Sequence, residues 1–155
     1  MDYNALLTPG VWRGKCGQKE EIEDSAAIVS KSKSLAKLIA KSKHFVVFTG
    51  AGISTSAGIS DFRGPKGVWT LEEKKEKGLE SNAKINNVLL QDAMPTKTHM
   101  AILALANSNH IKFLISQNID GLHMFSGIPR GKMAELHGNM FISCCEKVGL
   151  NFFPI

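Results

Sequence analysis

Glycines and small polar residues follow an apolar run near the middle of the chain. Residues 45–48 are typical of a buried strand and lead directly into Gly50-Ala51-Gly52-Ile53-Ser54. A strand that ends at glycines and turns into a helix presents unpaired backbone N–H groups, which favour phosphate. Gly52 has no Cβ, so the backbone there can approach a ligand closely. The pattern predicts a nucleotide site, with a tight turn that binds nothing as the alternative.

This motif differs from the G-x-G-x-x-G fingerprint of dinucleotide-binding proteins, because Thr55 stands where the third glycine belongs. The next glycine is Gly58, and no lysine follows to grip a phosphate. No acidic ribose ligand ends a second strand either. An ordinary nicotinamide-dependent dehydrogenase is therefore a weak alternative.

Two further polar groups follow apolar segments. Gln117, Asn118 and Asp120 come after the apolar run 111–116, where amides and a carboxylate can hydrogen-bond a ribose or a carboxamide. The alternative is an Asx-rich turn that satisfies its own backbone. His137 stands at the end of a short predicted strand, a suitable place for a general base near neutral pH. The alternative for any histidine is a structural role, and four others occur in the chain: His44, His99, His110 and His123.

Periodicity and capping residues predict the elements that position these groups. We expect helices from Asp24 or Ser25 to about residue 42, in a short stretch after the glycine turn, within the polar segment 71–87, and from Thr96 or Thr98 to about residue 106. We expect strands at 45–49, 111–116, 133–136 and 140–144. Long crossovers between strands indicate parallel pairing. The sequence thus predicts an α/β fold, a partial doubly wound, Rossmann-like sheet, with both polar groups at the carboxyl ends of strands, where ligands bind.

Composition bounds the class of protein. The chain has 155 residues, 43% of them hydrophobic and 21% charged, as in an ordinary globular domain. Three cysteines and the absence of a signal-peptide pattern or a long apolar run predict an intracellular protein that is not secreted and has no membrane partner. The net charge of +5 favours acidic partners such as nucleic acid or chromatin, although a solvated lysine-rich helix face explains it as well.

Four motifs, in this order and spacing, resemble those of the sirtuins, which are NAD-dependent protein-lysine deacylases. They are Gly50-Ala51-Gly52-Ile53-Ser54 with Gly58-Ile59, Asp61-Phe62-Arg63-Gly64, Ser116-Gln117-Asn118-Ile119-Asp120 and Leu136-His137-Gly138. The resemblance covers roughly residues 25–147 and is greatest to the nuclear, chromatin-associated branch. It implies NAD as cofactor, acyl-lysine proteins such as histones as substrates, and transfer of the acyl group to ADP-ribose with release of nicotinamide.

The resemblance also implies roles for individual residues. His137 is the expected catalytic base, and it takes a proton from a ribose hydroxyl. The expected cofactor-binding residues are Ala51, Gly52 and Thr55 at the pyrophosphate and nicotinamide end, Asp61, Phe62 and Arg63 on a cofactor-binding loop, Trp69 as an aromatic wall, Gln117 at the ribose, Asn118 and Asp120 at the nicotinamide pocket, and His137 itself. Phe62 is expected to shield the reacting ribose carbon from water, because water would otherwise hydrolyse a sugar cation.

The resemblance weakens toward the C-terminus. Sirtuins carry a zinc module with two Cys-x-x-Cys pairs; here Cys145 stands at the first ligand position and Val148 at the second. A closed site needs four ligands, so we expect an incomplete zinc site that binds no metal. We expect an N-terminal arm (1–24), a partial catalytic domain (25–147) with only the start of the zinc module, and an unrelated tail (148–155). The chain is then a truncated form with weak or no activity; the alternative is a non-catalytic isoform that binds protein partners or chromatin.

Overall fold

The computed structural model describes residues 13–79, 88–149 and 151–152. Contacts divide the chain into two compact units. The first unit contains residues 1–21 and 60–85, and the second contains residues 22–59 and 86–155. Among the described residues, none of the helices has the length and hydropathy that crossing a membrane requires.

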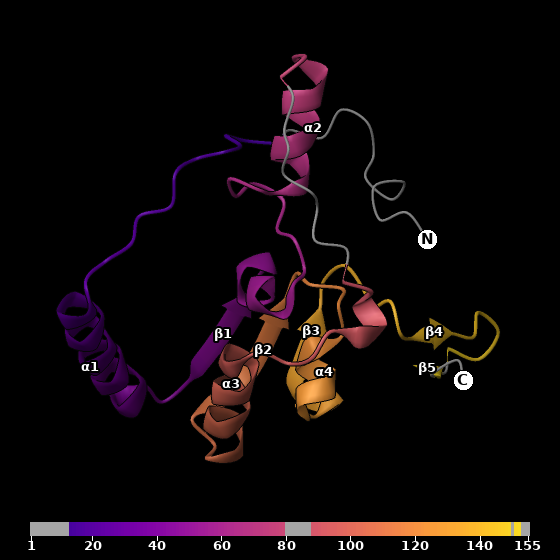
Figure 1. Cartoon of the computed structure of the whole chain (residues 1–155). Coiled ribbons are helices and arrows are strands. Elements are labelled where there is room, and N and C mark those ends of the chain that lie inside the picture. Colours follow the sequence, from indigo (N-terminus) through magenta and orange to yellow (C-terminus); the bar gives the residue numbers. More distant parts are fainter. Residues whose placement is uncertain (1–12, 80–87, 150, 153–155) are drawn as a thin grey trace. The chain divides into compact units, whose positions relative to one another are not determined.

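The second unit contains a parallel sheet. Its helices are α1 (Ser25–Lys41), α3 (Lys97–Asn107) and α4 (Leu122–Ser126), and its strands are β1 (Phe45–Thr49), β2 (Ile111–Ser116), β3 (Met133–Glu135), β4 (Ser143–Cys144) and β5 (Asn151–Phe152). Strands β1, β2 and β3 pair in that order and are parallel, whereas β4 and β5 form an antiparallel pair (Figure 1). The parallel α/β class predicted from the sequence is confirmed.

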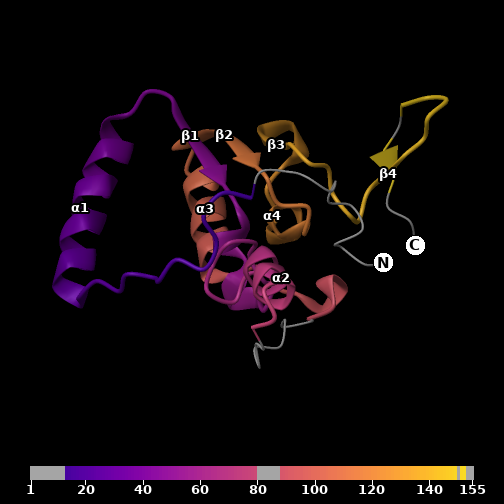
Figure 2. The same cartoon turned by 90° about the horizontal axis from the view of Figure 1, so that it is seen from above.

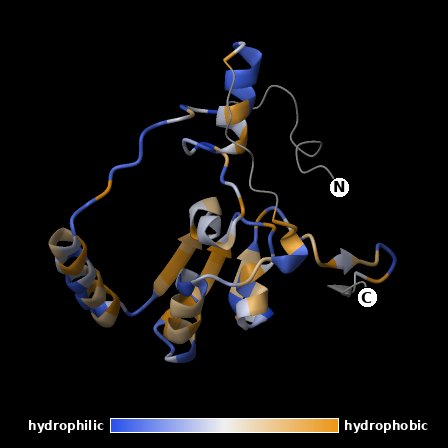
Figure 3. Cartoon of the chain, viewed as in Figure 1, coloured by the Kyte–Doolittle hydropathy of each residue, from blue (hydrophilic) through white to orange (hydrophobic). Residues whose placement is uncertain are grey.

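The core of this unit lies between the sheet and two helices. Helices α3 and α4 lie on the same face of the sheet (Figures 1 and 2). Leu114, in the central strand, is 1% exposed and packs with Ile102, Ala106, Ile111, Ile128 and Met133. Figure 3 shows β1 and β2 as mostly hydrophobic. Such runs are typical of parallel strands.

Local signals set the helix starts. The Asp24 side chain accepts a hydrogen bond from the backbone N–H of Ala27 at 2.7 Å and caps α1. Thr96 caps α3 in a capping box with His99. Both starts agree with the predictions, as do strands β1 and β2.

Two predicted details were wrong, and one helix was missed. The short helix expected after the glycine turn is a pair of 3-10 turns, Ala51–Ile53 and Thr55–Ala57, and the second ends at Gly58 in the left-handed conformation (φ 86°). The strand expected at 140–144 is limited to β4, because Phe141 N–H donates to the side chain of Asn139 in a turn. Helix α4 was not predicted; its five residues are too few for a periodic pattern.

The first unit is built around α2 (Val68–Glu76). The helix begins three residues before the polar segment that predicted it, because the N–H groups of Val68 and Trp69 donate to the carbonyls of Asp61 and Phe62, both at 2.9 Å. Its first turn, Val68 to Thr70, is the buried part. Residues 80–87 of that predicted segment lie outside the described residues.

Candidate functional site

The register of the sheet brings three loops of the second unit together. Thr49, Ser116 and Glu135, the last residues of β1, β2 and β3, stand side by side. The ladder continues beyond them, because Gln117 N–H donates to the Thr49 carbonyl at 3.1 Å and Leu136 N–H to the Ser116 carbonyl at 2.9 Å. The glycine turn, the polar segment 117–120 and the His137 segment therefore all leave from the carboxyl edge of the sheet. This edge is where parallel sheets bind ligands.

Buried hydrogen bonds join the glycine turn to the polar segment. Asn118 donates its amide to the Gly50 carbonyl at 3.1 Å and to the Ser54 hydroxyl at 3.2 Å. Ser54 in turn donates to Asp120 Oδ2 at 2.6 Å. Ser54 is 0% exposed, and Asn118 and Asp120 are also buried. The structure thus brings the predicted residues Asn118 and Asp120 against the glycine turn.

Asp120 also takes part in an Asx turn, which was the alternative interpretation of this segment. Its second oxygen, Oδ1, accepts a hydrogen bond from the backbone N–H of Leu122 at 3.0 Å, as in an Asx turn. Only its Oδ2 reaches the glycine turn. The carboxylate therefore links its own loop to a segment 66 residues earlier in the chain.

His137 lies at the exposed end of β3. Its Nδ1 atom is 2.9 Å from the backbone carbonyl oxygen of Gln117. A carbonyl oxygen only accepts hydrogen bonds, so Nδ1 carries the hydrogen and Nε2 keeps its lone pair. The Gln117 side chain is exposed at the same edge. The arrangement leaves an oriented, accessible basic nitrogen beside the polar segment.

The glycines of the turn face open space. Among the described residues, a Cβ atom added to Gly50 or Gly52 would meet nothing within 4 Å beyond the adjoining residues of the chain. Thr55, which is exposed, donates its hydroxyl to the Gly52 carbonyl at 3.0 Å, and Ala51 is half-buried. The turn can therefore accept a ligand directly against its backbone, which is what a nucleotide site requires of Gly52. These residues fit the cofactor that the sequence predicts.

The remaining predicted cofactor residues form a local cluster in the first unit. The Phe62 and Trp69 rings lie 4.9 Å apart, and the guanidinium carbon of Arg63 lies 5.1 Å from the Trp69 ring centroid. Arg63 also donates from Nε to the Arg13 carbonyl at 2.8 Å. Asp61 accepts from the Gly64 N–H at 3.1 Å, which closes the tight turn between them. Phe62, Arg63 and Trp69 are thus held together by stacking.

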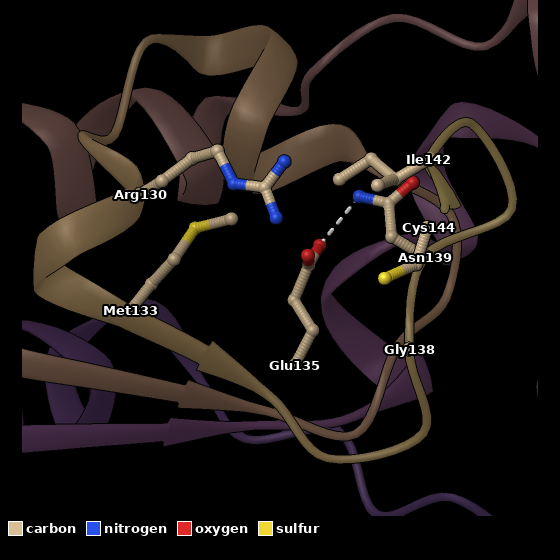
Figure 4. Close-up of a pocket in the computed structure, with 7 residues that line it drawn as sticks. All are labelled: Arg130, Met133, Glu135, Gly138, Asn139, Ile142 and Cys144. Atoms are coloured by element: carbon tan, nitrogen blue, oxygen red, sulfur yellow. Dashed lines mark hydrogen bonds between the residues drawn. The ribbon is translucent and has the colours of Figure 1, made fainter. Parts of the chain in front are cut away.

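A cavity of about 310 Å³ lies beside β3 (Figure 4). Asn139 donates to Glu135 across it at 2.6 Å, and burial raises the pKa of Glu135. Its other lining residues include Arg130, Met133, Ile142 and Cys144. None of the predicted cofactor residues lines this cavity, so it does not mark the nucleotide site.

The cysteines do not form a complete metal site. Cys144 and Cys145 follow one another, and both are free thiols. Within the described ranges, no group of three or more His, Cys, Asp or Glu side chains is arranged to hold a metal ion. The whole chain has only three cysteines, so it cannot supply four thiolates.

Ser54 and Thr49 are polar residues of the site that the sequence analysis did not select. Ser54 bonds to both Asn118 and Asp120, and Thr49 Oγ1 lies 2.9 Å from Nε2 of His123. Both residues belong to the glycine-containing segment 49–54, which predicted a nucleotide site. A hydroxyl at each end of a glycine turn was the available signal, but serine and threonine are too common beside turns to be singled out.

Comparisons with known proteins agree with this geometry. The Sir2 family model matches residues 50–152. The chain is 53% identical over 140 residues to the NAD-dependent protein deacetylase Sirt6 of Drosophila melanogaster, covering 90% of this chain and 42% of that protein. It is 44% identical over 128 residues to the human NAD-dependent protein deacetylase sirtuin-7, covering 83% of this chain and 30% of that protein. The chain spans less than half the length of these curated relatives.

Solved structures give the same result. A Sir2 complex with a p53 peptide and NAD+ has a TM-score of 0.57 and 32% identity, covering 78% of this chain and 51% of that one. The structure of Sir2Tm bound to a propionylated peptide has a TM-score of 0.55 and 30% identity, with 79% and 52% covered. The family model covers well over half of this sequence, and the parallel sheet matches that of solved members. The chain belongs to the Sir2 family.

Proposed function

We propose that this chain carries the base and the nicotinamide-ribose side of an NAD-dependent protein-lysine deacylase site. The observation that carries the proposal is the position of His137. Its Nε2, which has no hydrogen bond to another described residue, lies at the same sheet edge as the Asn118–Ser54–Asp120 hydrogen bonds and the glycine turn. A base, amide and carboxylate groups, and an exposed backbone turn are the groups that this chemistry requires. Relatives named as NAD-dependent deacetylases support it.

The resemblance to sirtuins implies the roles proposed in the second unit, and the geometry supports them. NAD, when bound, supplies the ribose that receives the acyl group as nicotinamide is released. His137 accepts the proton of a ribose hydroxyl at Nε2, and its Nδ1–H, held by the Gln117 carbonyl, keeps the ring oriented. Asn118 and Asp120 shape the nicotinamide pocket, and the Gln117 side chain contacts the ribose. Gly52, Ala51 and Thr55 lie along the pyrophosphate.

In the first unit we propose that Phe62 and Trp69 exclude water and that Arg63 binds a phosphate or a ribose oxygen. The tilted Phe62 and Trp69 rings, the latter buried, and the guanidinium over Trp69 form an apolar cluster with a cation at its margin. Exclusion of water matters because a water molecule is a competing acceptor in this transfer. Asp61 closes the turn that presents these side chains.

We further propose that the substrates are acyl-lysine proteins such as histones, and that the protein acts in the nucleus on chromatin. Solved relatives bound to acylated or p53 peptides support a protein substrate. The chain is basic, with a net charge of +5, and the lysines of α1 are all exposed. An exposed basic helix suits association with an acidic partner. The domain boundaries at residues 24 and 147 belong to the same proposal.

The test is a turnover assay on the 155-residue chain with an acetyl-lysine peptide and NAD. The products to detect by mass are the deacetylated peptide and O-acetyl-ADP-ribose. His137→Ala is expected to lower the rate by about 10²- to 10⁴-fold, the usual contribution of a general base. His110→Ala is the matched control, because His110 is also exposed but lies at the opposite end of β2.

Three outcomes oppose the proposal in different ways. A folded chain that binds ADP-ribose without turnover favours the non-catalytic alternative. Equal activity in both histidine variants removes His137 from the role of base. Hydride transfer, seen as a change in nicotinamide absorbance, indicates a dehydrogenase instead.

A further inference from the structure

Two buried histidines contact threonines that adjoin the glycine turn, and they have no role in the function proposed above. His99 of α3 and His123 of α4 are 0% and 2% exposed, and their ring centroids are 4.6 Å apart. Among the described residues, His99 Nε2 and His123 Nδ1 have no hydrogen-bond partner. Two unpaired buried nitrogens destabilise a fold. Buried polar atoms without a partner are expected where a residue serves function rather than stability.

The other nitrogen of each ring is joined to a threonine at one end of the turn. His123 Nε2 lies 2.9 Å from Oγ1 of Thr49, the residue that precedes Gly50. His99 Nδ1 accepts from the backbone N–H of Thr96 at 3.2 Å, and the one hydrogen of the Thr96 hydroxyl goes to the carbonyl of Ile53 at 3.0 Å. Ile53 ends the first 3-10 turn. The two rings, which contact each other at an interplanar angle of 57°, therefore connect both ends of the glycine turn.

The backbone N–H of Thr96 determines which ring nitrogen of His99 carries the hydrogen. The backbone N–H of Thr96 donates to His99 Nδ1 at 3.2 Å, so Nδ1 carries no hydrogen and Nε2 carries one. This neutral form keeps the capping box of α3 intact. Protonation at Nδ1 would put two hydrogens against each other and displace Thr96.

We propose that His99 and His123 are positioning residues for the glycine turn, residues 50–54. The two neutral rings, in contact with each other, hold Thr49 and Thr96, and these threonines fix the two ends of the turn. The two histidines position the turn in the unbound chain. Their effect on cofactor binding rests on the proposed function. Asp120 is the charged group that faces both rings, and each histidine faces the other.

Hydrogen exchange in the ligand-free chain tests the positioning itself. His99→Leu is expected to make the amides of the turn exchange about tenfold faster, because local opening becomes easier. His99→Asn is expected to restore slow exchange, since its Oδ1 replaces Nδ1 as acceptor of the Thr96 N–H. Ile102→Ala is the matched control: Ile102 is also buried on α3, but its side chain makes no polar contact with the turn.

The exchange rates of the turn in His99→Leu and Ile102→Ala are compared under conditions in which both variants have lost the same thermal stability. Faster exchange of the turn in Ile102→Ala as well, or unchanged exchange in His99→Leu, overturns the proposal. If His99→Leu does not fold, the nitrogen-15 spectrum of the imidazoles in the unchanged chain decides. A hydrogen on Nε2 of His99 is expected, and a hydrogen on Nδ1 overturns the proposal.

Binding of ADP-ribose separates this proposal from the proposed function. If the unchanged chain binds ADP-ribose, His99→Leu is expected to weaken binding more than Ile102→Ala does. If the unchanged chain does not bind ADP-ribose but exchange responds as expected, the positioning role stands and the cofactor proposal fails.

Discussion

The hydroxyl of Ser54 lies 2.6 Å from Oδ2 of Asp120, and both side chains are buried. This contact joins the loop after β1 to the loop after β2. It gives a buried carboxylate the donor that it requires, since an unpaired buried charge is strongly unfavourable. The same hydroxyl accepts from Asn118, so one serine organises both predicted nicotinamide-pocket residues.

Ser54→Ala is expected to lower the free energy of unfolding by about 1–3 kcal/mol, because Asp120 loses a buried donor. Urea unfolding followed by circular dichroism measures this. Ser56→Ala, at an exposed position two residues away, is the control and is expected to change stability by less than about 0.5 kcal/mol. Equal losses in the two variants would show that the hydrogen bond contributes nothing.

Gly67→Ala is expected to displace the turn that carries Phe62 and Arg63. Its Cβ would stand 2.5 Å from the Phe62 carbonyl carbon and 2.7 Å from the Arg63 nitrogen, both backbone atoms that cannot rotate away. Overpacking of this kind costs about 1–3 kcal/mol. The change is measured from Trp69 fluorescence in a Trp12→Phe background, because Arg63 would leave the Trp69 ring.

The control for this variant is Gly131→Ala. A Cβ at Gly131 meets nothing within 4 Å, and its φ is not left-handed. Its spectrum and stability are expected to match those of the parent. A Gly67→Ala protein with an unchanged Trp69 spectrum would contradict the geometry of this turn.

Stability is expected to fall as the pH falls from 6.5 to about 4. Burial, with a smaller effect from His99, lowers the pKa of His123 from 6.5 to about 4, and burial lowers the pKa of His99 as well. The unfolded chain therefore binds protons that the folded chain does not, so the stabilisation is complete above pH 6.5 and is lost on acidification. Asp120 faces both rings and opposes the shift.

His123→Gln is expected to flatten the pH dependence of stability across this window, whatever it does to stability at neutral pH. The urea midpoint measured at several pH values gives the slope. His110→Gln, at an exposed position, is the control and is expected to leave the slope unchanged. A parent-like slope in His123→Gln would exclude this histidine as its source.

Leu114→Ala is expected to lower the free energy of unfolding by about 2–5 kcal/mol, the cost of emptying a packed core position. Leu38→Ala makes the same chemical change on α1, where Leu38 is 67% exposed. Its expected effect is below about 0.5 kcal/mol. Similar losses in both would mean that α1 is packed in solution.

The sequence by itself determined the order of the main strands and helices and the place of two predicted segments at the sheet edge. The strands at 45–49 and 111–116 and the caps at Asp24 and Thr96 depend on local apolar runs and local hydrogen bonds, which can be recognised in a short stretch of sequence. The parallel class followed from the long crossovers between strands. Together they predicted that the glycine turn and residues 117–120 meet at one edge of the sheet.

The tertiary structure decided which atoms are paired there. Ser54 and Asp120 are 66 residues apart, and Thr49 and His123 are 74 apart. No local pattern distinguishes these residues from an ordinary serine, threonine or histidine. The contact of His137 with the Gln117 carbonyl and the burial of His99 against His123 likewise depend on how strands and helices pack. Sequence periodicity reports which face of an element is apolar, but the hydrogen-bond partner of a polar atom is determined only when distant segments come together.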